Sequence, residues 1–208
     1  MRASRNFRLR ILGEELRALA PHAESDLYFV TLINKNLEDS CWRSLWSARR
    51  IMESFRQHLN RSGTTAANGM VFGWLHGEYD PWARSYRLHV HVVVQGDKID
   101  RLRTLKGRWG YETVDGEAKR PVVFEKVKVP AWKKYTTRKQ PPGPTENVAR
   151  ALSYTHQSFW PCRPRYYAQN MKLHKSIARD RLPEPQYAEM LIWLRRERGL
   201  SVDRQLGS

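Results

Sequence analysis

Short hydrophobic runs rich in β-branched and aromatic residues recur along the chain, and this pattern is typical of β-strands. The predicted strands are residues 27–33, 70–78, 86–95 and 122–129. Residues 79–85 carry a proline and several polar residues between the second and third strands, so we predict that these two strands pair antiparallel. Pro130 cannot donate a backbone hydrogen bond and ends the fourth strand.

Hydrophobic residues recur at helical spacing in other segments. The predicted helices are residues 6–19, about 40–59, 98–109, 146–159 and 184–199. Asp39 or Ser40 can cap the second helix, Thr145 opens the fourth, and Pro161 ends the fourth. Residues 133–144 contain several cations and three prolines, which predicts a basic, irregular loop. The elements alternate in an α+β order without an internal repeat.

The length and hydrophobic content fit one domain. The chain has 208 residues, of which 40% are hydrophobic, and this is enough for a single core. We therefore expect one α+β domain over residues 1–208, built as a central antiparallel sheet with flanking helices. The core is expected over about residues 27–160, with a basic helix at 6–19 before it and a helical extension at 161–208 after it.

The charge of the chain points to a polyanionic partner. Lys and Arg number 37 against 21 Asp and Glu, which gives a formal charge of +16. Eight Trp and nine Tyr are interleaved with these cations, a combination that favours single-stranded nucleic acid because exposed rings stack on unpaired bases. Tyr135 is one ring flanked by cations. The candidate nucleic-acid contacts are Arg84, Arg87, Arg108, Trp109, Trp132, Lys133, Lys134, Arg138, Lys139 and Arg150.

Membrane insertion and secretion are not expected. The chain has no apolar run of about 18 residues and no short apolar segment behind its N-terminal basic residues. Its two cysteines, Cys41 and Cys162, form neither a CxxC pair nor a disulfide framework. A reducing, cytoplasmic location therefore fits best.

Two histidines lie two residues apart inside the third predicted strand. His89 and His91 therefore share one face, while Val90 and Val92 point to the opposite face, into the core. Two imidazoles on one face of a central strand form a preformed pair of metal ligands. The alternative interpretation is a strand face that is simply solvated.

The order of these elements resembles the HUH endonucleases, a family of rolling-circle replication initiators, relaxases and single-strand transposases. Phe29-Val-Thr-Leu-Ile33 is similar to the first motif of the initiators, and His89-Val-His91-Val-Val-Val-Gln95 to the second. The resemblance spans about residues 27–160 and implies a ferredoxin-like or RRM-like sheet. It also implies an initiator of replication for a plasmid or virus, acting in the cytoplasm of a bacterial or archaeal host.

The resemblance implies a metal ion, Mn²⁺ or Mg²⁺, held by His89, His91 and a third ligand. Glu78 is the predicted third ligand, because its strand should lie beside the histidine strand and initiators carry an acidic residue there. The alternative for Glu78 is a surface salt bridge to Arg84 or Arg87. His76 and Gln95 are the alternative ligands, since His76 shares the face of Glu78.

The resemblance also implies a tyrosine that attacks the scissile phosphate and leaves a 5′-phosphotyrosine and a free 3′-OH. Tyr154 is the predicted nucleophile, with Tyr135 as the alternative, followed by Tyr166 or Tyr167. The helix lacks the lysine that family members often carry three or four residues after the tyrosine, and Arg150 could supply that cation.

The implied partner is single-stranded DNA at a replication origin or hairpin. No GxxxxGK[ST] phosphate loop occurs, so no fused helicase is expected and none is required for nicking; a host helicase is a candidate partner. Two other readings stay open: a relaxase or transposase of the same superfamily, and a non-catalytic module that binds single-stranded nucleic acid through its sheet.

Overall fold

The computed structural model describes most of the expected core. The described residues are 12–22, 26–34, 38–39, 47–82, 84–112, 121–127, 143–155, 162, 165–167, 173–175 and 182–196. The strands are β1 (Leu27–Leu32), β2 (Glu38–Asp39), β3 (Val71–Asp80), β4 (Ser85–Gln95), β5 (Val122–Lys126), β6 (Arg165–Tyr167) and β7 (Leu173–Lys175). The helices are η1 (Ala20–His22), α2 (Ala48–Arg61), α3 (Lys98–Arg103), α4 (Pro144–Thr155) and α5 (Glu184–Arg196), and residues 12–19 are also helical.

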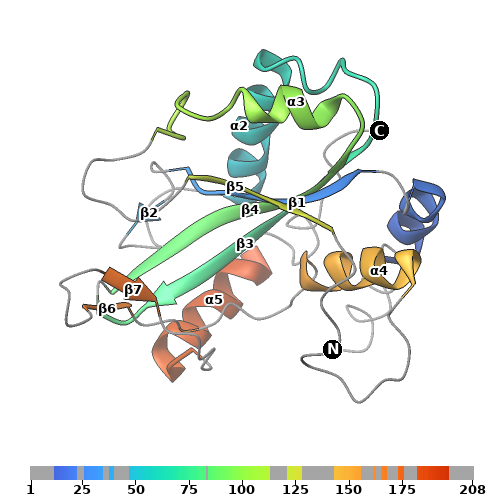
Figure 1. The fold of residues 1–208 in the computed structure, drawn as a ribbon. Helices are drawn as coiled ribbons and strands as arrows, with labels where there is room; N and C mark the ends of the chain where they lie inside the picture. The colour runs from blue at the N-terminus through green and yellow to red at the C-terminus, as the bar shows by residue number, and fades with distance from the viewer. Residues whose placement is uncertain are drawn as a thin grey trace.

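Within the described residues, five strands form one antiparallel sheet with β4 at its centre (Figure 1). β3 pairs with one edge of β4 over its whole length, from Val71↔Val94 to Asp80↔Ser85. β1 pairs with the other edge of β4, and the short β2 continues along that edge. β5 pairs antiparallel with β1. The predicted α+β class and the antiparallel pairing of residues 70–78 with the histidine strand are confirmed.

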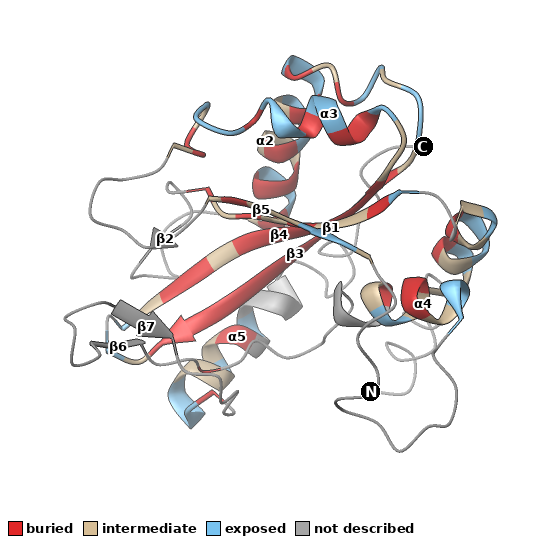
Figure 2. Ribbon diagram, viewed as in Figure 1, coloured by how far each residue is buried: buried red, intermediate tan, exposed pale blue. Residues whose placement is uncertain are grey.

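Helices cover both faces of the sheet. Successive side chains of a strand point to opposite faces, and both faces carry hydrophobic residues that pack against helices. Val90, Val92 and Val94 join the larger hydrophobic cluster, which also contains the buried side of α2. Phe72, Trp74 and Val93 point to the other face, where they pack with Val148 and Leu152 of α4 and with Leu19 of the N-terminal helical segment. Figure 2 shows β3 and β4 buried over most of their length.

The second helix begins later than the sequence pattern predicts. Glu38 and Asp39 form β2 and pair with Arg87 and Tyr86, so the prediction that Asp39 caps a helix is wrong. Ser47 is the actual N-cap, and its Oγ accepts a hydrogen bond of 3.0 Å from the backbone N–H of Arg50. An aspartate can cap a helix or lie in a β-ladder. Asp39 lies in a ladder because it is next to β4.

Other boundaries differ in detail. α3 ends at Arg103, and turns replace its predicted continuation to residue 109. The predicted C-terminal helical extension contains α5 and also a two-stranded sheet, β6 with β7. Of the predicted loop at residues 133–144, residues 133–142 lie outside the described residues, and Pro144 already belongs to α4. The predicted helix residues 6–11 also lie outside the described residues. None of the described helices has the length and apolar character needed to cross a membrane.

Candidate metal centre

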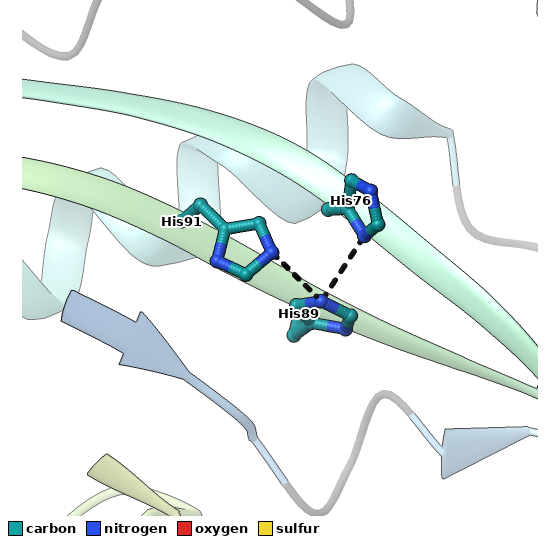
Figure 3. A group of neighbouring side chains, drawn as sticks. All are labelled: His76, His89 and His91. Atoms are coloured by element: carbon teal, nitrogen blue, oxygen red, sulfur yellow. Dashed lines mark hydrogen bonds between the residues drawn. The ribbon is translucent and has the colours of Figure 1, made fainter. Parts of the chain in front are cut away.

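Three histidines from two neighbouring strands point toward one another on one face of the sheet (Figure 3). His89 and His91 lie on the central strand β4, and the β3–β4 pairing places His76 directly opposite His89. Trp74 stands opposite His91 on the same face. The face is the one that α4 covers, opposite the α2 side of the sheet. The prediction that the two strand histidines share a face is therefore confirmed.

The three imidazoles converge on His89. Its Nε2 lies 3.1 Å from Nδ1 of His76 and 3.1 Å from Nε2 of His91. All three ligand atoms lie within 4.8 Å of one another. His76, His89 and His91 are only 3%, 6% and 3% exposed, so the interpretation as a solvated strand face is wrong.

The nitrogens on the far side of two of these rings have their own partners. Nδ1 of His89 lies 3.3 Å from the backbone carbonyl of Arg87, which can only accept a hydrogen bond. In the tautomer that this contact favours, the His89 Nδ1 carries the proton and its Nε2 presents a lone pair to the cluster. Nδ1 of His91 lies 3.2 Å from the Thr31 hydroxyl, across the β1–β4 pair Thr31↔His91. Such outer partners orient metal-binding imidazoles in proteins.

Two of the three separations between these nitrogens fit a metal ion. Two nitrogens bound at about 2.1 Å from one ion lie about 3.0–3.4 Å apart for bond angles of about 90–109°. Both separations at His89 Nε2, 3.1 Å, fall within this range. Three neutral imidazoles suit transition-metal ions better than they suit Mg²⁺. The cluster of His76, His89 and His91 can therefore hold a metal ion.

Glu78 faces a cation beside this cluster. Its Oε2 lies 3.5 Å from Nη2 of Arg87, and both side chains are 7% exposed. The register explains the contact, since Glu78 and Arg87 are directly opposite each other. This pair lies two residues along the strands from the pair of His76 and His89, on the same face. The structure thus brings His76, the alternative third ligand, into the cluster and pairs Glu78 with Arg87. The ion pair is buried, whereas the sequence suggested a surface salt bridge.

Gln95 lies on the histidine face but far along the strand. It is four residues beyond His91, which corresponds to about 13 Å in a strand. Its register partner is Leu27 at the start of β1, and its backbone N–H donates to the carbonyl of Met70. This separation places Gln95 away from the three histidines.

Helix α4 carries the predicted nucleophile on the histidine side of the sheet. Val148 and Leu152 anchor the helix against Phe72 and Trp74 of β3. Residue 154 lies in the last turn of this helix, two residues after Leu152, and its side chain is outside the described part of the structure. Tyr135 is outside the described residues as well. Tyr166 and Tyr167 lie on β6, and only their backbone is described.

The candidate nucleic-acid contacts are in different settings. Arg84 and Arg108 are exposed, and Arg150 is an exposed residue of α4 that lies 3.7 Å from Glu146. Arg87 is buried in the ion pair with Glu78, because side chains alternate along β4 and Arg87 shares the covered face with His89. Trp109 is half-buried against His58. The remaining candidates, Trp132, Lys133, Lys134, Arg138 and Lys139, lie outside the described residues.

One signal in the sequence could have favoured His76 over Glu78 as the third ligand. If a short turn joins the two strands at residues 81–84, Asp80 pairs with Ser85, and counting back pairs His76 with His89. The predicted connection, residues 79–85, is longer than this turn, so the predicted strand ends do not indicate this register. The outer partner Thr31 carried a weaker signal, since its role depends on the pairing of β1 with β4.

Comparisons with protein-family models, with curated protein sequences and with solved structures found no match.

Proposed function

We propose that this protein nicks and rejoins single-stranded DNA in a metal-dependent reaction, as HUH endonucleases do. The observation that supports the proposal best is the buried group of three imidazoles on a central antiparallel strand. Its placement agrees with the motif resemblance of residues 29–33 and 89–95. Helix α4, with Tyr154 in its last turn, packs on the same face. The formal charge of +16 supports a polyanionic substrate.

The proposed chemistry exchanges one phosphodiester for another. The Tyr154 hydroxyl oxygen attacks the scissile phosphorus, a bond from phosphorus to the tyrosine forms, and the bond to the 3′ oxygen breaks. The phenolic proton is lost, the departing oxygen takes up a proton, and the DNA ends as a free 3′-OH and a 5′-phosphotyrosine. Attack by a 3′-OH on the phosphotyrosine reverses these steps, so joining needs no ATP.

His76, His89 and His91 would hold the metal ion. A divalent ion bound there would polarise the scissile phosphate and stabilise the charge that develops on it. Of the two expected ions, Mn²⁺ is the better candidate, because it tolerates imidazole ligands better than Mg²⁺ does. The backbone carbonyl of Arg87 and the hydroxyl of Thr31 act through His89 and His91, whose rings they orient from the side away from the cluster.

The burial of the three imidazoles favours one alternative function. A closed site with its ligands 3–6% exposed is typical of a metal that stabilises a fold. The protein would then be a non-catalytic module that binds single-stranded nucleic acid. A relaxase or a transposase would share the chemistry of the first proposal and differ in its DNA target.

The test is incubation with Mn²⁺ and a diverse pool of labelled single-stranded oligonucleotides, followed by denaturing electrophoresis. We expect the wild type to form a denaturation-resistant adduct and Tyr154→Phe to form none, because the phenylalanine ring lacks the attacking oxygen. The matched control is Tyr187→Phe on α5, which removes a hydroxyl from another helix. An adduct that persists in Tyr154→Phe would move the nucleophile to Tyr135, Tyr166 or Tyr167. Tight binding without any adduct would favour the non-catalytic module.

Affinity for single-stranded DNA is expected to fall steeply as salt is raised. Each neutralised phosphate contributes about −0.7 to the slope of log K against log salt concentration for single strands. The exposed Arg108 should supply one such contact, so Arg108→Gln should make the slope shallower by about 0.7. Fluorescence anisotropy over a salt series measures this slope. A flat dependence in the wild type would contradict binding through phosphates.

A further inference from the structure

A cavity of about 310 Å³ lies on the face of the sheet opposite the histidines. α2 contributes Ser54, Phe55 and His58 to its wall, and the turn after α3 contributes Trp109 and Tyr111. β1 and β4 form its floor with Leu32 and Val90, side chains that belong to the α2 side of the sheet. Its size is at the small end of cavities that bind small molecules. The cavity is therefore separate from the metal centre.

The walls of this cavity carry flat rings in ordered contact. The rings of His58 and Trp109 are stacked, with centroids 5.8 Å apart and planes 13° from parallel. Tyr111 meets His58 edge-on, with centroids 5.6 Å apart and an angle of 83°. Aromatic walls of this kind favour flat, polarisable ligands, and every nucleobase offers such a face.

The backbone that presents Trp109 is held in an unusual conformation. Trp109 has a φ of 51°, in the left-handed region that bulky residues rarely adopt. The Asn34 side chain donates a 2.9 Å hydrogen bond to the Trp109 carbonyl. The same amide lies so close to Gly110 that a Cβ there would be 2.4 Å from its oxygen. Strain of this kind, supported by a specific contact, often marks a functional position.

Polar groups in the cavity can read a base edge by hydrogen bonding. Burial, and secondarily the charge of Arg61, lower the pKa of His58, so its imidazole is neutral at pH 7 and offers one donor and one acceptor. Nδ1 of His58 lies 3.5 Å from the Tyr111 hydroxyl. Ser54 adds a hydroxyl to the wall. An apolar floor with a few polar groups above it is typical of a specific ligand site.

Cations stand beside the cavity. Arg61 is close enough to His58 for its charge to affect the imidazole, and Arg108 directly precedes Trp109 in the turn. Both arginines are exposed, and neither forms an ion pair with any described residue. Exposed arginines next to a cavity with aromatic walls can neutralise the phosphates that flank a bound base.

We propose that this cavity binds one unpaired base of single-stranded nucleic acid, stacked against the wall that the rings of Trp109, His58 and Tyr111 form, with a neighbouring phosphate on Arg61 or Arg108. The inference rests on the single-stranded partner of the proposed function and not on its cleavage chemistry. A strand bound in this way contacts both faces of the sheet, and the base in the cavity anchors it away from the scissile phosphate.

The test compares Trp109→Asn with the wild type in fluorescence anisotropy with a labelled, mixed-sequence single-stranded oligonucleotide. Asparagine tolerates the left-handed conformation at position 109, so the ring is removed without added backbone strain. We expect binding to weaken about 5- to 100-fold, the effect of losing one base-stacking ring. Trp82→Ala removes an exposed ring outside the cavity and is expected to change the affinity less than about twofold.

A second variant and a second substrate make the test specific. Ser54→Phe fills the cavity without removing any of its rings and should weaken binding similarly. An abasic substitution scanned along the oligonucleotide should weaken wild-type binding at one position and have little effect at that position on Trp109→Asn. Circular dichroism monitors folding of each variant.

The outcomes separate this inference from the proposed function. Unchanged affinity in both folded variants, with tight wild-type binding, would overturn the base cavity and leave the single-stranded partner in place. Absence of any wild-type binding to single-stranded DNA and RNA would overturn both. Weakened binding in both variants together with intact adduct formation at saturating protein would support a base site outside the catalytic centre.

Discussion

Replacing His89 by alanine is expected to abolish Mn²⁺ binding and to lower DNA cleavage by at least about 10²-fold, the usual cost of losing a group that stabilises transition-state charge. His89 is the most informative of the three ligands because its Nε2 lies 3.1 Å from a nitrogen of each of the others. Affinity for single-stranded DNA should remain largely intact, since the proposed phosphate contacts are with exposed arginines outside the cluster, such as Arg108. Calorimetric titration with Mn²⁺ and denaturing electrophoresis measure the two losses.

His22→Ala is the matched control, since it removes an imidazole that lies outside the cluster, in η1. Thr31→Val provides a graded variant, because it keeps the shape of the side chain and removes only the hydroxyl 3.2 Å from His91 Nδ1. Loss of such an outer partner lowers metal affinity by about 10- to 100-fold. Undiminished cleavage in His89→Ala would refute the metal-dependent mechanism. Loss of metal binding without any cleavage in the wild type would identify a structural metal.

Replacing Glu78 by glutamine is expected to lower the free energy of unfolding by about 3–5 kcal/mol, because it removes the carboxylate that the buried Arg87 faces. Both side chains of this ion pair are 7% exposed, with 3.5 Å between Oε2 and Nη2. The double variant Glu78→Leu, Arg87→Met should recover most of the loss, since apolar residues of similar size replace buried ion pairs at little cost. Chemical denaturation with urea measures these differences.

The exposed pair Arg49–Glu53 offers the matched control. Its side chains are 69% and 44% exposed, so Glu53→Gln should cost less than about 1 kcal/mol. Mn²⁺ titration of Glu78→Gln separates the two roles that this residue could play. Metal affinity close to that of the wild type would agree with the role in the ion pair, and a large loss of affinity would make Glu78 a ligand after all. A stability change as small as that of Glu53→Gln would contradict the buried pair.

The sequence already indicates those parts of the site that depend on one strand or one helix. The spacing of His89 and His91 places them on one face because side chains alternate along any strand, and Val90, Val92 and Val94 identify the opposite face as core. The α+β class follows in the same way from hydrophobic periodicity. These predictions need only local geometry, and the structure confirms them.

The choice of third imidazole depends on the register between two strands. A shift of two residues in the β3–β4 register would have placed Glu78, and not His76, opposite His89. The length of the β3–β4 turn determines this register, and it could not be read from the hydrophobic pattern because both strands extend beyond their hydrophobic runs. Asp39 likewise had the chemistry of a helix cap, and only the neighbouring strand made it part of a ladder.

Local sequence thus determines the class of fold, the faces of the strands, the basic charge and the two strand histidines. Tertiary structure decides that His76 completes the cluster, that Glu78 pairs with Arg87, and that Asn34, His58 and Trp109 meet around one cavity. The physical reason is that periodicity is a property of consecutive residues. Contacts between residues distant in sequence depend instead on register and on how the helices pack against the sheet.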